Sequence, residues 1–200
     1  MHMKKKLLIA VPCYRNHHFV RPLAASLARC PDELIRLNAC IIFYNDSPDC
    51  IDLDKELNLA KDILSKLPVY IQTNEKNIGY VKTSNQAIER AIADASDILL
   101  LNSDTIIFPG ALTELSAVAH EDPMVGFVNP RSNNATLATF PHGVDQLNLL
   151  PEEAHEIFRQ SARRLNRFTY VPTAVGFCLY IKHEVIAEFG VFDPIFGLGY

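Results

Sequence analysis

The chain has 200 residues, which is enough for one domain that buries a substantial core. A net charge of −4, with 48% hydrophobic and 21% charged residues, describes a globular protein and argues against a nucleic-acid-binding domain, which is usually strongly basic. Five cysteines without a C-x-x-C pair argue against a zinc ribbon or a disulfide framework and favour a reducing compartment.

The first 128 residues alternate between apolar runs and stretches with helical spacing. Apolar runs typical of buried parallel strands predict strands at 7–11, 37–44, 69–71, 97–101 and 125–128. Apolar residues at helical spacing predict helices at 19–28, 53–67 and 81–95, and a further helix to about His120 with Pro109 in its first turn. Strands that alternate with such helices form right-handed βαβ units, so the predicted fold class is α/β with a parallel sheet.

The alternation breaks after Asn129. Residues 129–150 form a long polar connection, and a connection of this length is usually a functional loop. Pro151 predicts the first turn of a helix over 149–167, and the segment 169–181 is expected to hold one or two strands around a glycine.

These two patterns divide a single domain, 1–200, into a nucleotide-binding half (1–128) and an acceptor half (129–200). No apolar run approaches the ~20 residues that span a bilayer. We therefore expect a cytoplasmic protein without a transmembrane segment in this chain, associated at most peripherally with the inner face of the membrane.

Polar residues follow four of the predicted strands. They occupy positions 12–15, 45–47, 74–79 and 102–104. Because ligands bind beyond the carboxyl ends of the strands in open α/β sheets, and parallel strands bring these ends to one edge, the four segments should form one site.

The sequence contains neither of the two common phosphate-binding loops, G-x-G-x-x-G and G-x-x-x-x-G-K-[ST]. A diphosphate at this edge therefore needs another group that neutralises its negative charge. A divalent cation held by Asp104 would provide it, since Mg²⁺ and Mn²⁺ prefer carboxylate, phosphate and water oxygens. The spacing leaves an alternative open, in which Asn102 and Asp104 cap the following helix or form a turn.

The chain resembles family 2 glycosyltransferases of the bacterial type, the inverting group with the GT-A fold. The resemblance lies in six segments: VPCYR, YNDSPD, NIGYVKTSNQAI, LLLNSDTIIFPGAL, FVNPRSNNATLATFP and VPTAVGFCLYIKHEVIAEFGVFDPIFGLGY. It implies a nucleotide-diphospho-sugar transferase fold, with a mostly parallel central sheet flanked by helices. It also implies Mn²⁺- or Mg²⁺-assisted transfer of a sugar from a nucleotide-diphosphate sugar to a hydroxyl, with inversion. The acceptor would be a glycan, a lipid-linked molecule or a protein, in glycan or cell-surface polysaccharide synthesis.

Carried over position by position, the resemblance implies a donor site. Its implied donor-binding residues are Pro12, Tyr14, Arg15, Asn45, Asp46, Asn77, Gly79, Lys82, Asn85, Asn102 and Ser103. Asp104 is the implied metal ligand, and Asn102 would contact the ribose or a metal-bound water. Two positions depart from the family pattern: Arg15 replaces the usual Asn, and Asn45-Asp46 reverses the commoner order of Asp then Asn.

The family pattern places an acidic pair, which supplies the general base, shortly after the F-G-x-G-Y segment that ends this sequence. The resemblance therefore implies that the domain is incomplete at its C-terminal end, so that 129–200 is a partial acceptor half, and that the base lies beyond Tyr200. We expect the 200-residue chain to bind nucleotide and metal but to transfer sugar poorly or not at all. Asp193 and Glu184 are candidate substitutes, although both fit a late helix and turn. A non-catalytic nucleotide-sugar-binding module is the alternative function. A nucleotidyltransferase would normally show a glycine-rich loop after the first strand, which VPCYRNHH lacks.

Overall fold

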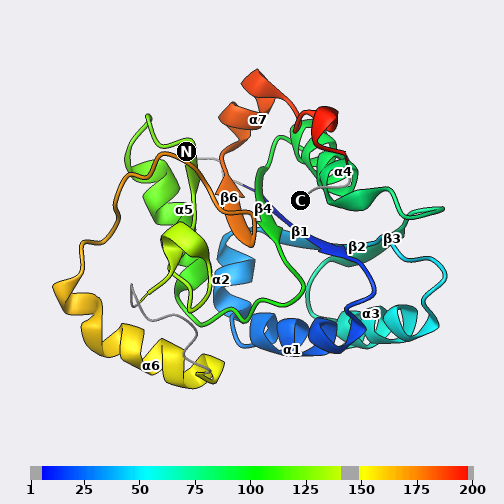
Figure 1. Ribbon diagram of the computed structural model, residues 1–200, viewed down its shortest axis with the longest axis horizontal. Coiled ribbons are helices and arrows are strands. Elements are labelled where there is room, and N and C mark those ends of the chain that lie inside the picture. The colour runs from blue at the N-terminus through cyan, green and yellow to red at the C-terminus, as the bar shows by residue number, and fades with distance from the viewer. Residues whose placement is uncertain (1–5, 141–148, 198–200) are drawn as a thin grey trace.

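The computed structural model describes residues 6–140 and 149–197, and Figure 1 shows a central sheet with helices on both of its faces. The six strands lie in the order β3-β2-β1-β4-β6-β5. They are β1 (Leu7–Cys13), β2 (Ala39–Asn45), β3 (Val69–Thr73), β4 (Asp97–Leu101), β5 (Phe127–Val128) and β6 (Cys178–Ile181). The helices are α1 (His17–Ala28), α2 (Pro31–Arg36), α3 (Ile51–Ile63), α4 (Gly79–Ala93), α5 (Ala111–Glu121), α6 (Pro151–Ser161) and α7 (His183–Phe189), and short 3-10 helices lie at Thr136–Ala138, Ala162–Arg164 and Pro194–Phe196. None of the described helices is both long and apolar enough to cross a membrane.

The sheet is mostly parallel and becomes mixed at one side. β1 is parallel to β2 and β4, and β2 is parallel to β3, so the predicted α/β fold class is confirmed. β6 instead runs antiparallel to both of its neighbours, β4 and β5. Of the predicted strand region 169–181, only the last four residues form a strand.

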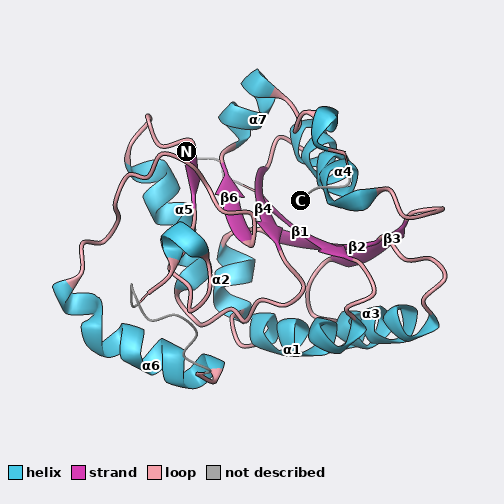
Figure 2. Ribbon diagram, viewed as in Figure 1, coloured by secondary structure: helices cyan, strands magenta, loops and turns pink. Residues whose placement is uncertain are grey.

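Figure 2 shows helices on both faces of the sheet, and one cluster of buried apolar residues lies on each face. Ile9 and Val11 of β1 pack with apolar residues of α1, α3 and α5, whereas Leu8 and Ala10 pack with those of α4 and α7. Successive side chains of a strand point to opposite faces. A central strand covered by helices on both faces is therefore apolar at every position, which explains the continuous run LLIAV.

The helix after β4 begins later than predicted. Pro109 precedes its first turn, because Gly110 has a φ of +96° and α5 begins at Ala111. A glycine adopts this left-handed conformation without the steric cost that other residues bear. The carboxylate of Glu33, on the unpredicted helix α2, accepts hydrogen bonds from the N–H of Gly110 at 2.6 Å and of Thr113 at 2.8 Å. These bonds satisfy N–H groups that a helix start leaves free.

α6 is shorter than the predicted helix over 149–167. Pro151 is its first residue, as predicted, but the helix ends at Ser161 and a 3-10 turn follows. None of its residues is buried, and Figure 1 shows it at the periphery of the molecule. The ring of His155 stacks on that of Phe108 with 4.0 Å between centroids, which connects α6 to the loop after β4. Residues 141–148 of the predicted long loop lie outside the described residues.

Candidate donor-binding site

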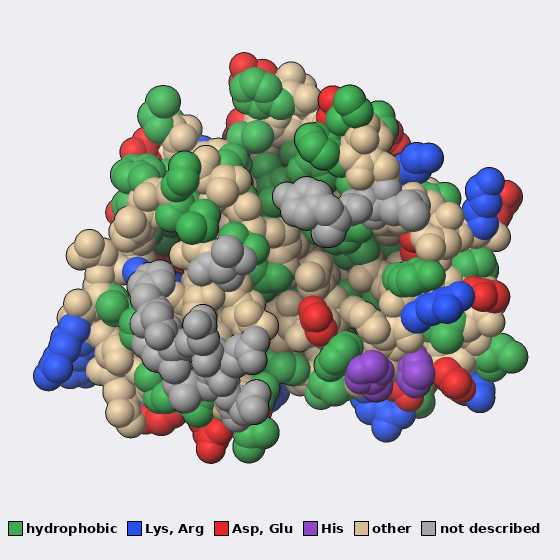
Figure 3. All heavy atoms as spheres, viewed as in Figure 1, with side chains coloured by type: hydrophobic (Ala, Val, Ile, Leu, Met, Phe, Trp, Pro, Cys, Tyr) green, Lys and Arg blue, Asp and Glu red, His purple; other side chains and the backbone are tan. Residues whose placement is uncertain are grey.

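An open cavity of about 190 Å³ lies at the carboxyl edge of the neighbouring strands β1 and β4. Its lining residues are Pro12, Tyr14, Asn16, Asn102, Ser103 and Asp104. Five of these six were predicted as site residues, and the structure brings them together from two loops that are about ninety positions apart. On the face of the molecule that Figure 3 shows, most charged side chains lie near its outline.

Asp104 presents an exposed carboxylate to this cavity. Among the described residues, none donates a hydrogen bond to it or forms an ion pair with it. The N–H of Thr105 bonds to the carbonyl of Asn102 at 3.3 Å, so a turn does form here. The helix-cap alternative is wrong for Asp104, because α5 begins only at Ala111 and Glu33 caps it.

The donor atoms near Asp104 suit a cation that arrives with a diphosphate. The cavity offers one carboxylate, together with the side-chain oxygens of Asn102 and Ser103. Within 6–140 and 149–197, no group of three or more His, Cys, Asp or Glu residues could hold a metal. Mg²⁺ commonly binds through one or two carboxylates plus substrate phosphates, so this donor set fits such an ion better than a metal cage built by the protein alone.

The turn after β1 is conformationally strained. Arg15 has a φ of +57°, in the left-handed region that L-residues other than Asn and Asp rarely adopt. Its N–H donates to the hydroxyl of Ser47 at 3.1 Å, and its guanidinium lies 5.4 Å from the centroid of the Tyr14 ring. This turn leaves Tyr14 46% exposed in the cavity wall.

Asn45 lies at the same edge, but its side chain is fully buried and used within the fold. Its amide nitrogen donates to the carboxylate of Asp54 at 2.7 Å, and its oxygen accepts the N–H of Ser47 at 2.9 Å. Asn45 therefore orders the turn after β2 and joins it to α3. Its contact with a nucleoside stays a prediction.

Asp46 connects the end of β2 to the start of α4. Its Oδ1 accepts the amide of Asn74 at 2.8 Å and the N–H of Ile78 at 2.9 Å. Its Oδ2 accepts the N–H of Gly79 at 2.9 Å. The carboxylate thus caps α4 from another element, and its predicted nucleoside contact is likewise untested.

The four remaining predicted residues surround the first turns of α4. The side-chain oxygen of Asn77 accepts the N–H of Gly79, which has a φ of +83°. Both polar atoms of the Asn85 amide bond to the backbone of Phe192 at 2.8 Å, so this amide joins α4 to the segment after α7. Lys82 is exposed and, among the described residues, has no hydrogen-bond or ion-pair partner. Lys82 does not line the cavity, and its predicted contact with the donor stays a prediction.

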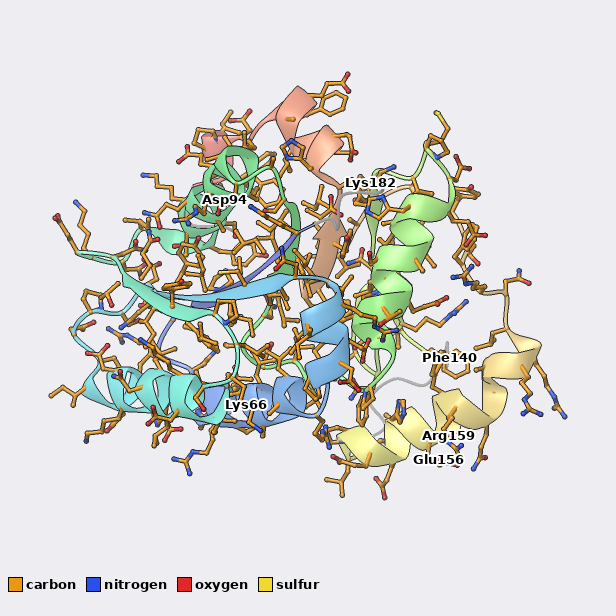
Figure 4. All side chains as sticks on the ribbon, turned by 180° about the vertical axis from the view of Figure 1, so that it is seen from behind. Lys66, Asp94, Phe140, Glu156, Arg159 and Lys182 are labelled. Atoms are coloured by element: carbon orange, nitrogen blue, oxygen red, sulfur yellow. The ribbon has the colours of Figure 1, made fainter. Side chains whose placement is uncertain are left out.

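A second cavity, of about 290 Å³, lies at the opposite edge of the sheet. It is lined by His120, Asp122, Pro123, Lys182 and Glu184. Because β6 is antiparallel to β4, with Ile181 opposite Ile98, the residues after β6 emerge at the amino edge. Figure 4 labels Lys182 there, near the end of α5 and away from Glu156 and Arg159 on α6.

This arrangement contradicts the candidate base role of Glu184, which lies at the edge opposite to Asp104. The other candidate, Asp193, caps the last 3-10 helix by accepting the N–H of Ile195 at 2.9 Å. Neither carboxylate lines the cavity that holds Asp104.

The sequence profile described as Glycosyl transferase family 2 matches residues 8–190, which is most of the chain. The chain belongs to this family. A search of curated protein sequences finds no match.

Solved structures with the same fold are GT-A glycosyltransferases. One is a mannosyltransferase from Pyrobaculum calidifontis in complex with GDP-Man and Mn²⁺, with a TM-score of 0.62 and 13% identity over 96% of this chain and 48% of that one. A second is GalNAc-T7 with UDP, GalNAc and Mn²⁺, with a TM-score of 0.61 and 14% identity over 96% of this chain and 37% of that one. A third is TarS from S. aureus, residues 1–349, with UDP-GlcNAc. Its TM-score is 0.52, with 21% identity over 70% of this chain and 37% of that one. The chain thus spans less than half the length of each of these proteins.

Two residues at the carboxyl edge of the sheet in this family 2 glycosyltransferase domain were not predicted from the sequence. Asn16 lines the cavity and follows directly after the VPCYR segment, so its place after the first strand was the available signal. Asn129 lies beyond β5 and bonds to the segment that enters β6. No sequence signal connects Asn129 to the site, because its partners are 46 and 49 residues away.

Proposed function

We propose that the protein transfers a sugar from a nucleotide-diphosphate sugar to an acceptor hydroxyl, with inversion at the anomeric carbon, in glycan or cell-surface polysaccharide synthesis. The observation that carries the proposal is the free carboxylate of Asp104, which shares a cavity with Tyr14 at the carboxyl edge of the sheet. Family membership supports the reaction class. Structures of the same fold hold GDP-Man, UDP or UDP-GlcNAc, two of them with Mn²⁺, which supports the ligand class.

In this mechanism, the two loops of the cavity bind and orient the donor. Asp104 would hold the cation, with Asn102 and Ser103 as the neighbouring polar groups. When bound there, Mn²⁺ or Mg²⁺ would supply Lewis-acid chemistry that offsets the charge on the departing diphosphate. The exposed ring of Tyr14 provides a surface for the base or ribose, and Lys82 offers a positive charge for the phosphates.

The acceptor hydroxyl must also lose its proton to a general base. Asp104 is the only acidic residue that lines the described cavity, and the proposal assigns it to the cation. The proposal therefore assigns the base to an acidic residue outside the lining of this cavity. The same observation favours the second candidate, in which this chain binds a nucleotide sugar without transferring it.

The proposal extends to location and acceptor. We place the reaction in the cytoplasm, at most peripheral to the inner membrane face, and this is supported by five free cysteines. Burial raises the pKa of the Cys13 and Cys178 thiols to about 12, which suits thiols that stay reduced and unreactive. The acceptor class remains a glycan, a lipid-linked molecule or a protein.

A thermal-shift screen tests the proposal, because a ligand that binds the folded state raises the melting temperature by mass action. UDP, GDP and their common sugar conjugates are each added with Mn²⁺ and with EDTA. We expect at least one nucleotide to raise the melting temperature in Mn²⁺ and to lose most of this effect in EDTA. No shift with any of them would overturn the proposal. Turnover of the same donor, measured as released nucleotide diphosphate, separates transfer from binding alone.

A further inference from the structure

The segment that enters β6 lies directly beside the turn that carries Asp104. Leu101, the last residue of β4, pairs with Cys178, the first residue of β6. The N–H of Asn102 then donates to the carbonyl of Phe177 at 2.8 Å. The backbone of the metal-binding turn is thus anchored on the segment 175–178, which we call the strap.

The strap is held from behind by one side chain, Asn129. Its amide nitrogen donates to the carbonyl of Val175 at 2.7 Å and to the carbonyl of Cys178 at 2.6 Å. Its side-chain oxygen accepts the N–H of Val175 at 2.9 Å. Both N–H groups of the amide and its oxygen are therefore used on a single four-residue segment, and the side chain is half-buried.

On its other side the strap contacts α4. The hydroxyl of Tyr80 donates to the carbonyl of Gly176 at 3.1 Å. The strap thus lies between α4, the end of β4 and Asn129, and its backbone groups have partners on each side. These bonds hold the strap in one conformation. At Cys178, the buried residue of the strap, a carbonyl without a partner would be costly.

We propose that Asn129 is a positioning residue for the donor site. It fixes the strap, the strap fixes the backbone of Asn102 through the Phe177 carbonyl, and this sets the turn that presents Asp104. The inference rests on the proposed function, since the consequence that matters is the affinity for a nucleotide with its cation. Asn129 itself does not line the cavity, so it acts on the ligand through the strap.

The chemistry of the position requires an amide. Asn129→Ala removes all three hydrogen bonds and leaves the Val175 and Cys178 carbonyls without their donor. Asn129→Asp keeps the size and the acceptor for the Val175 N–H, but places a carboxylate against two carbonyl oxygens. Both variants should therefore loosen the strap, and the aspartate variant keeps the test available if the alanine variant folds poorly.

Tyr180→Phe is the matched control. Tyr180 lies in β6, the strand that the strap enters. Its hydroxyl donates to the buried carboxylate of Asp97 at 2.6 Å, at the opposite edge of the sheet. This variant loses a buried hydrogen bond of β6 without touching the strap. It separates a general loss of stability from an effect at the donor edge.

Amide hydrogen exchange tests the strap without any ligand. In Asn129→Ala and Asn129→Asp, we expect the amide of Asn102 to exchange at least tenfold faster than in the wild-type chain, and in Tyr180→Phe to stay within twofold. Asn102 is the informative probe because its own hydrogen bond is not removed by either variant. An unchanged rate at Asn102 in both Asn129 variants would overturn the inference.

Calorimetric titration with UDP and GDP in Mn²⁺ tests the consequence. We expect the Asn129 variants to bind the preferred nucleotide at least tenfold more weakly than wild type, and Tyr180→Phe to bind within twofold. Wild-type affinity in the Asn129 variants would overturn the inference and leave the proposed function standing. Absence of binding by the wild-type chain would overturn the proposed function and, with it, the positioning role.

Discussion

The carboxylate of Asp46 accepts the backbone N–H of Gly79 at 2.9 Å, although 33 residues separate them in the sequence. This bond, with those from Asn74 and Ile78, joins the carboxyl end of β2 to the first turn of α4. These hydrogen bonds connect the loop after β2 to the loop before α4, two loops of the predicted site. The same hydrogen bonds explain why an acidic residue directly after β2 is only 3% exposed.

Replacing Asp46 by Ala should destabilise the protein by about 3 kcal/mol, because two backbone N–H groups and a buried amide lose a charged acceptor. Urea unfolding followed by circular dichroism measures this loss. Asp62→Ala, which removes an exposed carboxylate on α3, should change the unfolding free energy by less than about 0.5 kcal/mol. Equal stability of the two variants would show that Asp46 does not hold α4.

Glu33 makes stability depend on pH. Burial alone would raise the pKa of Glu33, but the hydrogen bonds from Gly110 and Thr113 outweigh it and hold the pKa below the ordinary value of 4.5. A carboxyl whose pKa is lowered by folding stabilises the protein above its unfolded pKa, and this contribution is lost as the pH falls through the folded pKa.

Glu33→Gln should therefore cost about 1 kcal/mol at pH 7, the usual size of a helix-cap contribution. The difference from wild type should shrink as the pH falls below about 4.5, the unfolded pKa of a glutamate. Urea unfolding at several pH values measures both effects. Glu89→Gln, at an exposed position of α4, is the control and should show no such pH-dependent loss. If the loss of unfolding free energy in Glu33→Gln stays constant from pH 7 to pH 3, Glu33 does not make stability depend on pH.

Arg15→Asn should stabilise the protein by about 1 kcal/mol, because Asn tolerates the left-handed conformation that Arg15 adopts at φ +57°. Arg15→Ala is the matched control, since it removes the side chain but keeps the backbone cost, and it should not gain this stability. Thermal unfolding of the three proteins measures the difference. If Asn and Ala have the same effect, the turn after β1 is not strained.

The sequence predicts the first four strands of the sheet because each contains a local apolar run. β1, β2 and β4 are buried along nearly their whole length, whereas β3 is an edge strand whose Tyr70 is exposed. It does not predict the direction of β6, since Cys178–Ile181 pairs with β4 from a distance of about eighty residues. The start of α5 was also missed, because its cap comes from Glu33 on another helix. Local patterns thus identify elements, and long-range partners decide their ends and directions.

The candidate site shows the same division. The rule that ligands bind at carboxyl strand ends predicts the cavity formed by Tyr14, Asn102 and Asp104. The internal roles of Asn45 and Asp46 depend on partners that only the folded chain brings near. A polar residue after a strand can face a ligand or hold the loop, and its position in the sequence does not distinguish these two uses.

Calorimetric titration of UDP and GDP into the Asp104→Ala variant, with and without Mn²⁺, tests the central claim most directly. We expect Mn²⁺ to strengthen nucleotide binding to the wild-type chain. In the presence of Mn²⁺, Asp104→Ala should bind the nucleotide at least tenfold more weakly than wild type, and Asp62→Ala should bind it with wild-type affinity. Mn²⁺-dependent binding of equal strength in wild type and Asp104→Ala would contradict the assignment of Asp104 as the metal ligand of the donor site.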